Sequence, residues 1–334
     1  MKKVIFFIII FIIIIFLLCE FSPITEILNI KTSTPYVSDN GYLHVDGTLL
    51  KNQNGKDFTL KGVSSHGIQW YSDVITYDNL KSLKENWNIN VFRIAMYTDE
   101  NGYISNKDTI KEKLINIVNN VIDLDMYVIV DWHILKDNDP NIYIEDAKTF
   151  FNEISILYKD SPNVIYEICN EPSGNVVTWD DQIKPYAEEI IPIIRNNSPK
   201  SLIIVGTPNW CQKLEDAANN PLNFDNIMYS CHFYSGTHDK DLQNSIDGAL
   251  NKGIAIFISE WGTTDMTGNG EIYIYKTNEW MDFLKSRNIS WVNWSFSNKN
   301  ESSAIINSSY NINNGEDFND YLTESGLYVK SLFK

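Results

Sequence analysis

Two glutamates stand in short motifs that could carry acid–base chemistry. Glu171 lies in the motif Asn-Glu-Pro and Glu260 lies in Ser-Glu-Trp-Gly, each directly after an apolar run. Hydrolysis of a glycosidic bond requires one carboxylic acid that protonates the leaving oxygen and one carboxylate that attacks the anomeric carbon. Enzymes that retain the anomeric configuration hold these two groups about 5–5.5 Å apart. We therefore predict this chemistry, on condition that the fold brings the two carboxyl groups together.

Basic and phenolic side chains elsewhere in the chain strengthen this prediction. Two carboxyl groups at such a distance do not both ionise readily, so the pKa of one rises and that residue becomes the acid. We expect Arg93 to hold Glu260 ionised as the nucleophile, and Tyr234 to donate a hydrogen bond to it. We expect His232 to orient Glu171. Each residue taken singly has a structural explanation, and the prediction rests on their occurrence together.

Other side chains in comparable positions are suited to sugars. Asn170 is expected to bind a sugar 2-hydroxyl, an interaction that strengthens in the transition state. Indole rings offer flat apolar surfaces for pyranose rings, and we assign this role to Trp70, Trp210 and Trp294. Asp131, in contrast, is expected to be structural.

These residues need a scaffold that brings the ends of several strands together. Short β-branched runs alternate with longer segments of helical periodicity, which predicts an α/β fold, a (β/α)8 TIM barrel with its catalytic groups at the carboxyl ends of the strands. An open doubly wound sheet is the alternative, but it usually carries a glycine-rich turn after an early strand, and this sequence has none. The expected strands are Phe58–Val63, Asn90–Ile94, Tyr127–Asp131, Val164–Ile168, Leu202–Val205, Ile227–Cys231, Ala255–Ser259 and Ser290–Trp294. The expected helices are Asp78–Glu85, Thr109–Leu124, Ile144–Tyr158, Asp180–Arg195, Gln212–Ala218, Leu242–Asn251, Ile272–Ser286 and Phe318–Leu332.

The segment before the first barrel strand predicts a β-hairpin. Asp46-Gly47 and Asn54-Gly55 are dipeptides typical of tight hairpin turns. We expect a short N-terminal β-hairpin that closes the bottom of the barrel. The expected organisation is a signal peptide or membrane anchor over residues 1–21, a short tether over 22–36 and one catalytic domain over 37–334.

The first residues carry a membrane-targeting pattern. Met-Lys-Lys precedes an unbroken apolar run, Val4–Cys19, as in the signals that direct secretion. A helix of this length spans about 24 Å, less than the ~30 Å hydrocarbon core of a bilayer. The length favours a cleaved signal peptide, and the alternatives are an uncleaved anchor and a lipid-modified Cys19. All three predict a secreted or extracellular domain, anchored to the membrane by residues 4–19 if that segment is retained.

Charge and cysteine content narrow the classes of partner. The formal net charge is −16, from 43 acidic and 27 basic residues, and a nucleic-acid-binding protein would need a basic surface instead. Cys169, Cys211 and Cys231 form no CxxC pattern, so we expect them to be buried apolar residues rather than metal ligands. We predict no metal, no cofactor and no protein partner.

Seven stretches of the sequence resemble glycoside hydrolase family five, and within it the bacterial-type endoglucanase subfamily. The similarity runs from about Gly41 to the C-terminus, in family order and spacing. The loop Asn-Lys-Asn-Glu-Ser-Ser-Ala at 298–304 also resembles the loop after strand eight of that subfamily, with Asn298 where relatives often carry Asp. The matching stretches are KGVSSHGIQWY (61–71), FRIAMY (92–97), DWH (131–133), YEICNEP (166–172), HFY (232–234), SEWG (259–262) and NWS (293–295).

The resemblance implies an activity and a role for each matching position. It implies a retaining endo-β-1,4-glucanase, a cellulase that binds β-glucan polysaccharide or oligosaccharide, with Glu171 as acid/base and Glu260 as nucleophile. It implies support of these two glutamates by Arg93, His133, Asn170, His232 and Tyr234. It implies sugar contacts by His66, Trp70, Tyr97, Trp210, Trp294, Lys299 and Glu301. A β-mannanase, a mixed-linkage β-glucanase and a catalytically silent carbohydrate-binding surface protein are the alternatives.

Overall fold

Eight parallel strands close into a barrel in the computed structural model, which describes residues 34–333. The strands are hydrogen-bonded in the order β10-β3-β4-β5-β6-β7-β8-β9, and β10 pairs with β3. This last pairing excludes an open doubly wound sheet and confirms the predicted (β/α)8 barrel. The strands are β3 (Lys61–Ser65), β4 (Val91–Tyr97), β5 (Tyr127–His133), β6 (Val164–Glu167), β7 (Ile203–Val205), β8 (Ile227–Tyr234), β9 (Ile256–Gly262) and β10 (Ser290–Phe296).

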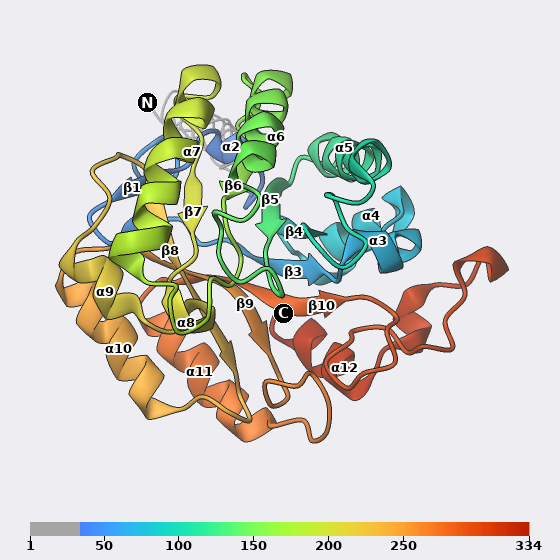
Figure 1. The fold of residues 1–334 in the computed structure, drawn as a ribbon. Helices are drawn as coiled ribbons and strands as arrows, with labels where there is room; N and C mark the ends of the chain where they lie inside the picture. The colour runs from blue at the N-terminus through green and yellow to red at the C-terminus, as the bar shows by residue number, and fades with distance from the viewer. Residues whose placement is uncertain (1–33, 334) are drawn as a thin grey trace, which may run out of the picture. The chain divides into compact units, whose positions relative to one another are not determined.

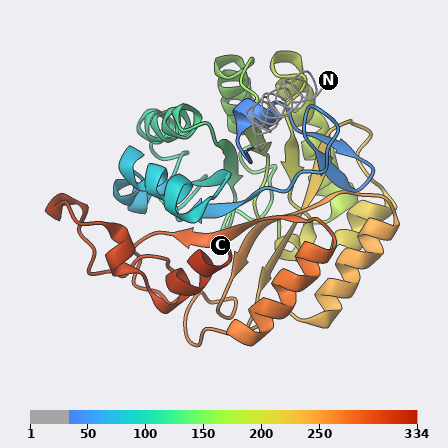
Figure 2. The same ribbon diagram turned by 180° about the vertical axis from the view of Figure 1, so that it is seen from behind.

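Helices surround these strands on the outside, as Figures 1 and 2 show from opposite sides. Their apolar faces bury a core between helix and strand. The α-helices are α2 (Val37–Asn40), α3 (Ile68–Tyr71), α4 (Tyr77–Trp87), α5 (Lys107–Asp123), α6 (Ile144–Leu157), α7 (Lys184–Asn197), α8 (Pro208–Cys211), α9 (Leu214–Asn219), α10 (Lys240–Asn251), α11 (Ile274–Ser286) and α12 (Glu324–Ser331). The 3₁₀ turns are η1 (Ser72–Val74), η3 (Ile312–Asn314) and η4 (Phe318–Tyr321), and η2 (Trp179–Ile183) is a π-helical turn. Within residues 34–333, no helix combines the length and apolar character that crossing a bilayer requires.

The last predicted helix, over residues 318–332, is wrong in its first part. The turn η4 ends at Tyr321, and α12 begins only at Glu324. Thr323 separates the two because its backbone is extended. Its N–H donates to the Ile305 carbonyl and not to a carbonyl within a helix. Its hydroxyl oxygen then caps α12 by accepting from the Gly326 N–H at 3.0 Å.

An apolar plug fills the barrel at the amino ends of its strands. Strands β1 (His44–Asp46) and β2 (Leu49–Lys51) form the predicted antiparallel hairpin. Leu50 of β2 and Leu43, the residue before β1, are buried in a cluster with inward residues of the barrel strands such as Ile129. The Tyr127 hydroxyl donates to the Gly41 carbonyl at 2.7 Å in the same region. The hairpin therefore closes this end of the barrel, as predicted.

Several strands run further toward the opposite end than the sequence predicts. The predicted ends at Ile94, Asp131, Cys231 and Ser259 lie two or three residues short of the ends at Tyr97, His133, Tyr234 and Gly262. The polar residues in these extensions continue the strand hydrogen bonding, as in the pairing of Tyr97 with His133. Half of the predicted site residues therefore lie on the sheet itself and not on loops, which holds their side chains in fixed positions. They are Arg93, Tyr97, His133, His232, Tyr234, Glu260 and Trp294.

Candidate active site

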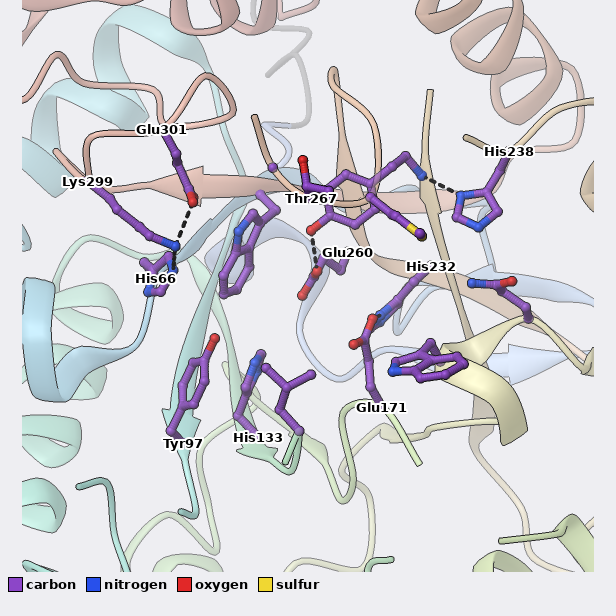
Figure 3. Close-up of a pocket in the computed structure, with 17 residues that line it drawn as sticks. His66, Tyr97, His133, Glu171, His232, His238, Glu260, Thr267, Lys299 and Glu301 are labelled. Carbon is purple, nitrogen blue, oxygen red and sulfur yellow. Dashed lines mark hydrogen bonds and ion pairs between the residues drawn. The ribbon is translucent and has the colours of Figure 1, made fainter. Parts of the chain in front are cut away.

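A cleft of about 460 Å³ lies at the carboxyl ends of the strands. In Figure 3, Lys299, Glu301 and His66 lie at one end of it and His238 at the other, with Glu260 and Glu171 between them. Arg93 and Asn170 are fully buried and do not line the cleft. The predicted site residues that do line it are His66, Tyr97, His133, Glu171, Trp210, His232, Tyr234, Glu260, Trp294, Lys299 and Glu301.

The two glutamates approach one another across this cleft. A carboxylate oxygen of Glu171, one of Glu260 and a ring nitrogen of His232 all lie within 4.8 Å of one another. Glu171 follows β6, beyond its last residue, whereas Glu260 lies within β9. This separation matches the two-carboxyl arrangement of retaining glycosidases, which leaves no room for a water between catalytic group and sugar.

Strand β9 carries an extra residue at the motif that contains Glu260. Residues 230–232 of β8 span residues 257–260 of β9 in the ladder, and residues 291–293 of β10 span residues 258–261. A β-bulge of this kind redirects the side chains that follow it. Ser259 and Glu260 are consecutive, yet both reach polar partners inside the barrel. The bulge is what allows one strand to supply two neighbouring side chains to the site.

Glu260 is surrounded by hydrogen-bond donors. The Tyr234 hydroxyl donates to its Oε1 at 2.7 Å, and Nη1 of Arg93 lies 3.3 Å from its Oε2. Burial and the neighbouring Glu260 raise the pKa of Tyr234 well above its usual value, so the phenol keeps its proton and donates. Both contacts favour the ionised form of Glu260, the form that a nucleophile requires.

Arg93 joins the interior acids into one network. Its Nε lies 2.7 Å from Glu167, and its Nη2 lies 3.0 Å from Asp131 and 2.7 Å from the Asn170 side-chain oxygen. With the contact to Glu260, a single buried cation serves three buried carboxyl groups. The fixed fork of a guanidinium suits this arrangement better than the single ammonium of lysine. The three carboxyl groups together carry more negative charge than Arg93 carries positive charge. This excess favours proton binding by a nearby acid that Arg93 does not contact.

Glu171 has a different environment from Glu260. Its Oε1 lies 2.8 Å from Nδ1 of His232, and 13% of the side chain is exposed. Burial raises the pKa of Glu171 and of Glu260, each to about 7. Burial lowers the pKa of His232 to about 4, so its ring is neutral and gives no ion pair to Glu171. Because only Glu260 contacts a cation and a phenol, we place the shared proton on Glu171.

His133 and Asn170 form a second buried group beneath the cleft. Nδ1 of His133 lies 2.6 Å from Asp131, which fixes the ring. The Asn170 amide nitrogen donates to the Ile134 carbonyl at 3.1 Å and lies 3.3 Å from Nε2 of His133. Asn170 therefore uses its amide hydrogens within the protein, and the predicted contact with a sugar 2-hydroxyl stays a prediction. The expected structural role of Asp131 agrees with its contacts.

Aromatic rings line one end of the cleft. His133 stacks between Tyr97 and Trp294, with ring centroids 4.1 and 5.6 Å away. Trp70 is 44% exposed and does not line the cleft itself, but its ring centroid lies 5.1 Å from that of Tyr97. His66 packs against the same group at 4.8 Å from Trp294. These flat apolar surfaces beside polar groups are suited to pyranose rings.

Trp210 also lines the cleft, with 45% of its surface exposed. Asn209, Trp210 and Cys211 all have positive φ, at 58°, 55° and 59°, a conformation that costs free energy in non-glycine residues. Hydrogen bonds to the Asn-Glu-Pro motif hold it: Trp210 N–H donates to the Pro172 carbonyl at 3.2 Å, and the Cys211 thiol donates to the Asn170 carbonyl at 2.9 Å. Cys169, Cys211 and Cys231 are all buried, as predicted, and all three are free.

Lys299 closes the aromatic end of the cleft. Its ammonium lies 2.6 Å from Glu301 and 3.1 Å from Nε2 of His66. Burial lowers the pKa of His66 to about 3, so this ring is neutral, and its Nδ1 accepts from the Gly67 N–H at 2.7 Å. Asn298, the position that departs from the family pattern, points away and donates to the Tyr310 carbonyl at 3.2 Å.

Several cleft residues were not predicted from the sequence. They lie in loops between the strands and helices, whose paths depend on tertiary contacts and not on a local pattern. His238, for example, is placed by a 2.9 Å hydrogen bond from the Tyr234 N–H to its Nδ1. Ser259 and Glu167 were inside quoted motifs but received no role. The unpredicted lining residues are Leu135, Gln212, His238, Met266, Thr267 and Gly268.

Comparison with known proteins agrees with this geometry. The chain is 52% identical over 300 residues to an endoglucanase of Clostridium saccharobutylicum, covering 90% of this chain and 66% of that protein. It is 52% identical over 276 residues to endoglucanase A of Evansella cellulosilytica, covering 83% and 56%. The chain thus spans less than two thirds of the length of these curated relatives.

Solved structures extend the comparison to the fold. The cellulase Cel5C_n superimposes with a TM-score of 0.87 at 44% identity, covering 91% of this chain and 94% of the other. The catalytic domain of a Thermobifida fusca endoglucanase, solved with cellotetraose, gives 0.85 at 36% identity, covering 90% and 99%. The profile of the family described as Cellulase (glycosyl hydrolase family 5) matches residues 51–300. With most of its barrel inside that match, the chain belongs to glycosyl hydrolase family 5, the cellulase family.

Proposed function

We propose that this protein is a retaining endo-β-1,4-glucanase that hydrolyses internal bonds of cellulose and related β-glucans by double displacement. The observation that carries the proposal is the pair Glu171 and Glu260, with carboxylate oxygens within 4.8 Å of one another across an open cleft. The two glutamates have different hydrogen-bond partners, and each set of partners suits the role proposed for that glutamate. Glu260 receives hydrogen bonds from Tyr234 and Arg93, and Glu171 faces a neutral histidine.

In the first step Glu260 attacks the anomeric carbon. The bond between that carbon and the glycosidic oxygen breaks, and the oxygen takes the proton of Glu171. A covalent ester between Glu260 and the sugar results, while the shortened chain departs. Arg93 and Tyr234 then contact a group that has lost its negative charge, so their main contribution is to keep Glu260 ionised before attack.

In the second step Glu171 acts as a base. It removes a proton from water, and the water oxygen attacks the anomeric carbon of the ester. Glu260 leaves as a carboxylate and regains its hydrogen bonds with Tyr234 and Arg93. Two inversions at one carbon give net retention of configuration.

The cleft supports a polymeric substrate, because it offers sugar-binding surfaces on both sides of the glutamates. His66 and Lys299 lie on one side and His238 lies on the other. Trp294 packs beside His66, and Trp210 also lines the cleft, with its backbone bonded to Pro172 next to Glu171. An endo-acting enzyme must hold sugars on both sides of the bond that it cuts. The cellotetraose bound by the Thermobifida fusca relative makes a β-1,4-glucan the substrate that we propose for this chain.

We also propose that the domain acts outside the cytosol. The support is the sequence pattern Met-Lys-Lys followed by the apolar run Val4–Cys19, which lies outside the described residues. Cellulose cannot enter a cell, so an enzyme that cuts it must meet it outside. Cell fractionation of the source organism with an antibody to the barrel domain checks this; detection only in the cytosol contradicts it.

A polysaccharide panel tests the activity. Purified protein is incubated with carboxymethylcellulose, lichenan and mannan, and reducing ends and viscosity are followed together. We expect a rapid fall in viscosity on carboxymethylcellulose, because internal cuts shorten chains before they release many ends. Preference for mannan or lichenan supports the β-mannanase or mixed-linkage alternative. Binding without release of reducing ends supports the silent carbohydrate-binding alternative, and Glu260→Ala is the inactive control.

A further inference from the structure

A chain of hydrogen bonds runs from Glu171 into the centre of the barrel. Nδ1 of His232 lies 2.8 Å from Glu171 Oε1, and Nε2 of the same ring lies 3.0 Å from the Ser259 hydroxyl. That hydroxyl lies 2.6 Å from Oε1 of Glu167, whose Oε2 lies 2.7 Å from Nε of Arg93. Ser259, Glu167 and Arg93 are fully buried. The bulge in β9 is what turns the Ser259 side chain toward His232.

The donor and the acceptor of each hydrogen bond in this series can be assigned by starting from Glu167, at its buried end. Glu167 is paired with the Arg93 guanidinium and is therefore a carboxylate, which only accepts. The Ser259 hydroxyl has one hydrogen and gives it to Glu167 over the 2.6 Å contact. Its oxygen then accepts at 3.0 Å, so the partner nitrogen Nε2 of His232 carries a hydrogen. The Ser230 hydroxyl, 2.6 Å away, is left as a second donor to Ser259.

A neutral imidazole carries one hydrogen, which decides the contact with Glu171. With the hydrogen on Nε2, Nδ1 of His232 presents a lone pair. The 2.8 Å contact between Nδ1 and Glu171 Oε1 is then a hydrogen bond only if Glu171 donates, that is, if its carboxyl group is protonated.

We propose that Ser259, fixed by Glu167, is a positioning residue that holds His232 in the Nε2-protonated tautomer and thereby keeps the acid proton on Glu171. This inference rests on the proposed function, because it assigns a means of control to its acid/base. After glycosidic cleavage Glu171 is an anion that faces the Nδ1 lone pair. That repulsion makes the carboxylate a stronger base for the attack of water.

The groups that face Glu171 and His232 come from several strands. From β4, Arg93 lowers the pKa of Glu171, and from β6, Glu167 raises it. From β9, Glu260 raises the pKa of His232, but burial outweighs it and lowers the pKa to about 4. The remaining ionisable neighbours of these two residues are Tyr97 on β4, Asp131 and His133 on β5, Tyr234 on β8, Cys211 and His238. None of them contacts Nδ1, so the tautomer of His232 is set by Ser259.

The first test is the substitution Ser259→Ala, read through the pH profile of kcat/KM on cellopentaose. Without the acceptor at Nε2 the ring can place its hydrogen on Nδ1 and donate to ionised Glu171. We expect the alkaline limb to move down by about one pH unit, a tenfold loss at high pH. Hydrolysis of 2,4-dinitrophenyl β-cellobioside, whose leaving group needs no proton, should keep its first-step rate within about twofold.

Matched variants separate this role from a general packing effect. Ser259→Thr keeps the hydroxyl and should restore the alkaline limb. Ser230→Ala removes a neighbouring hydroxyl at the same level of the barrel, while the contact between Ser259 and His232 stays. It should leave the limb unmoved. An unmoved limb in Ser259→Ala, or an equal movement in Ser230→Ala, overturns the proposal.

A measurement that does not depend on catalysis separates this test from the test of the proposed function. Nitrogen NMR of histidine-labelled protein, with the His232 signals assigned by His232→Gln, reports which ring nitrogen carries the hydrogen. We expect hydrogen on Nε2 in the wild type and a shift toward Nδ1 in Ser259→Ala. Hydrogen on Nδ1 in the wild type overturns the tautomer proposal even if the enzyme cuts cellulose. Failure to cut any β-glucan overturns the proposed function, whatever the tautomer.

Discussion

The Tyr234 hydroxyl donates to Oε1 of Glu260 at 2.7 Å. Within residues 34–333 no phenol donates to Glu171; its near neighbour is a neutral imidazole, because burial lowers the pKa of His232 to about 4. The two carboxyl groups therefore differ in protonation state because they contact different residues. Ionised Glu260 and protonated Glu171 together are the state from which the proposed double displacement begins.

The activity of the wild type should follow a bell-shaped pH profile. Burial raises the pKa of both glutamates to about 7, so the pair holds one proton over a range below and around neutrality. As the pH falls, Glu260 becomes protonated and cannot attack; as the pH rises past about 7, Glu171 loses the proton that it must donate. We expect kcat/KM on cellopentaose to fall about tenfold per unit on the alkaline side. A profile flat from pH 6 to 9 contradicts this prediction.

Tyr234→Phe should move the acid limb of that profile upward. The substitution removes a hydrogen bond to a charged oxygen, which is worth about 1.5–3 kcal/mol. Glu260 should then bind its proton at higher pH, and kcat/KM should fall about 10- to 100-fold at pH 6. Stopped assays between pH 4 and 8 measure the limb. Loss of activity with an unchanged acid limb would show that the phenol acts elsewhere than on Glu260.

Azide should rescue the two glutamate variants with opposite stereochemistry. In Glu260→Ala, turnover should fall by about 10⁴-fold or more, and azide in the vacated space attacks the anomeric carbon directly. Its product is the α-glycosyl azide. In Glu171→Ala, an activated aryl cellobioside still forms the ester, and azide displaces Glu260 to give the β-glycosyl azide. Proton NMR of the products distinguishes them; the same anomer from both variants refutes the assigned roles.

Glu171→Gln should stabilise the protein at neutral pH and leave its stability at pH 4.5 nearly unchanged. The folded-state pKa of Glu171 is raised from 4.5 to about 7, so the folded state keeps a proton that the unfolded state has lost. Stability therefore falls between these two pH values, by about 1.4 kcal/mol per unit and ~3 kcal/mol in all, and glutamine removes this loss. Its amide can also donate to Nδ1 of His232.

Urea unfolding of both proteins at pH 4.5, 6 and 7.5 measures this difference. Glu188→Gln supplies the matched change at an exposed position of α7. A gain in stability that is the same at all three pH values would mean that the substitution acts through packing and not through the proton.

Sequence periodicity was sufficient to predict the barrel, because the alternation of buried strands and amphipathic helices is a local property. It was insufficient to predict where strands such as β4 and β8 end. Their last residues, Ala95-Met96-Tyr97 and His232-Phe233-Tyr234, contain no β-branched residue that would mark a strand. They stay in the sheet through their pairing with β5 and β9. The division of the last predicted helix at Thr323 has the same origin, since a distant carbonyl fixes that residue.

Motifs were sufficient to identify the two glutamates and most of the cleft lining, but they did not assign Ser259 a role. In a regular strand, Ser259 and Glu260 would point to opposite faces of the sheet. Only the extra residue in β9 brings both inside, and an extra residue is visible in the ladders with β8 and β10, not in the motif itself. Loop residues such as His238 and Met266 gave no local signal, since the folded loops bring them to the cleft.

The plug formed by Leu43, Leu50 and the inward residues at the amino ends of the strands lies at the opposite end of the barrel from the chemistry. Heat tolerance and turnover are therefore adjustable by separate sets of substitutions. Volume-conserving changes in the plug should alter the temperature at which the enzyme fails while its rate constants persist. A variant for use at high temperature can therefore gain stability from that end while Glu171, Glu260 and their contacts stay unchanged.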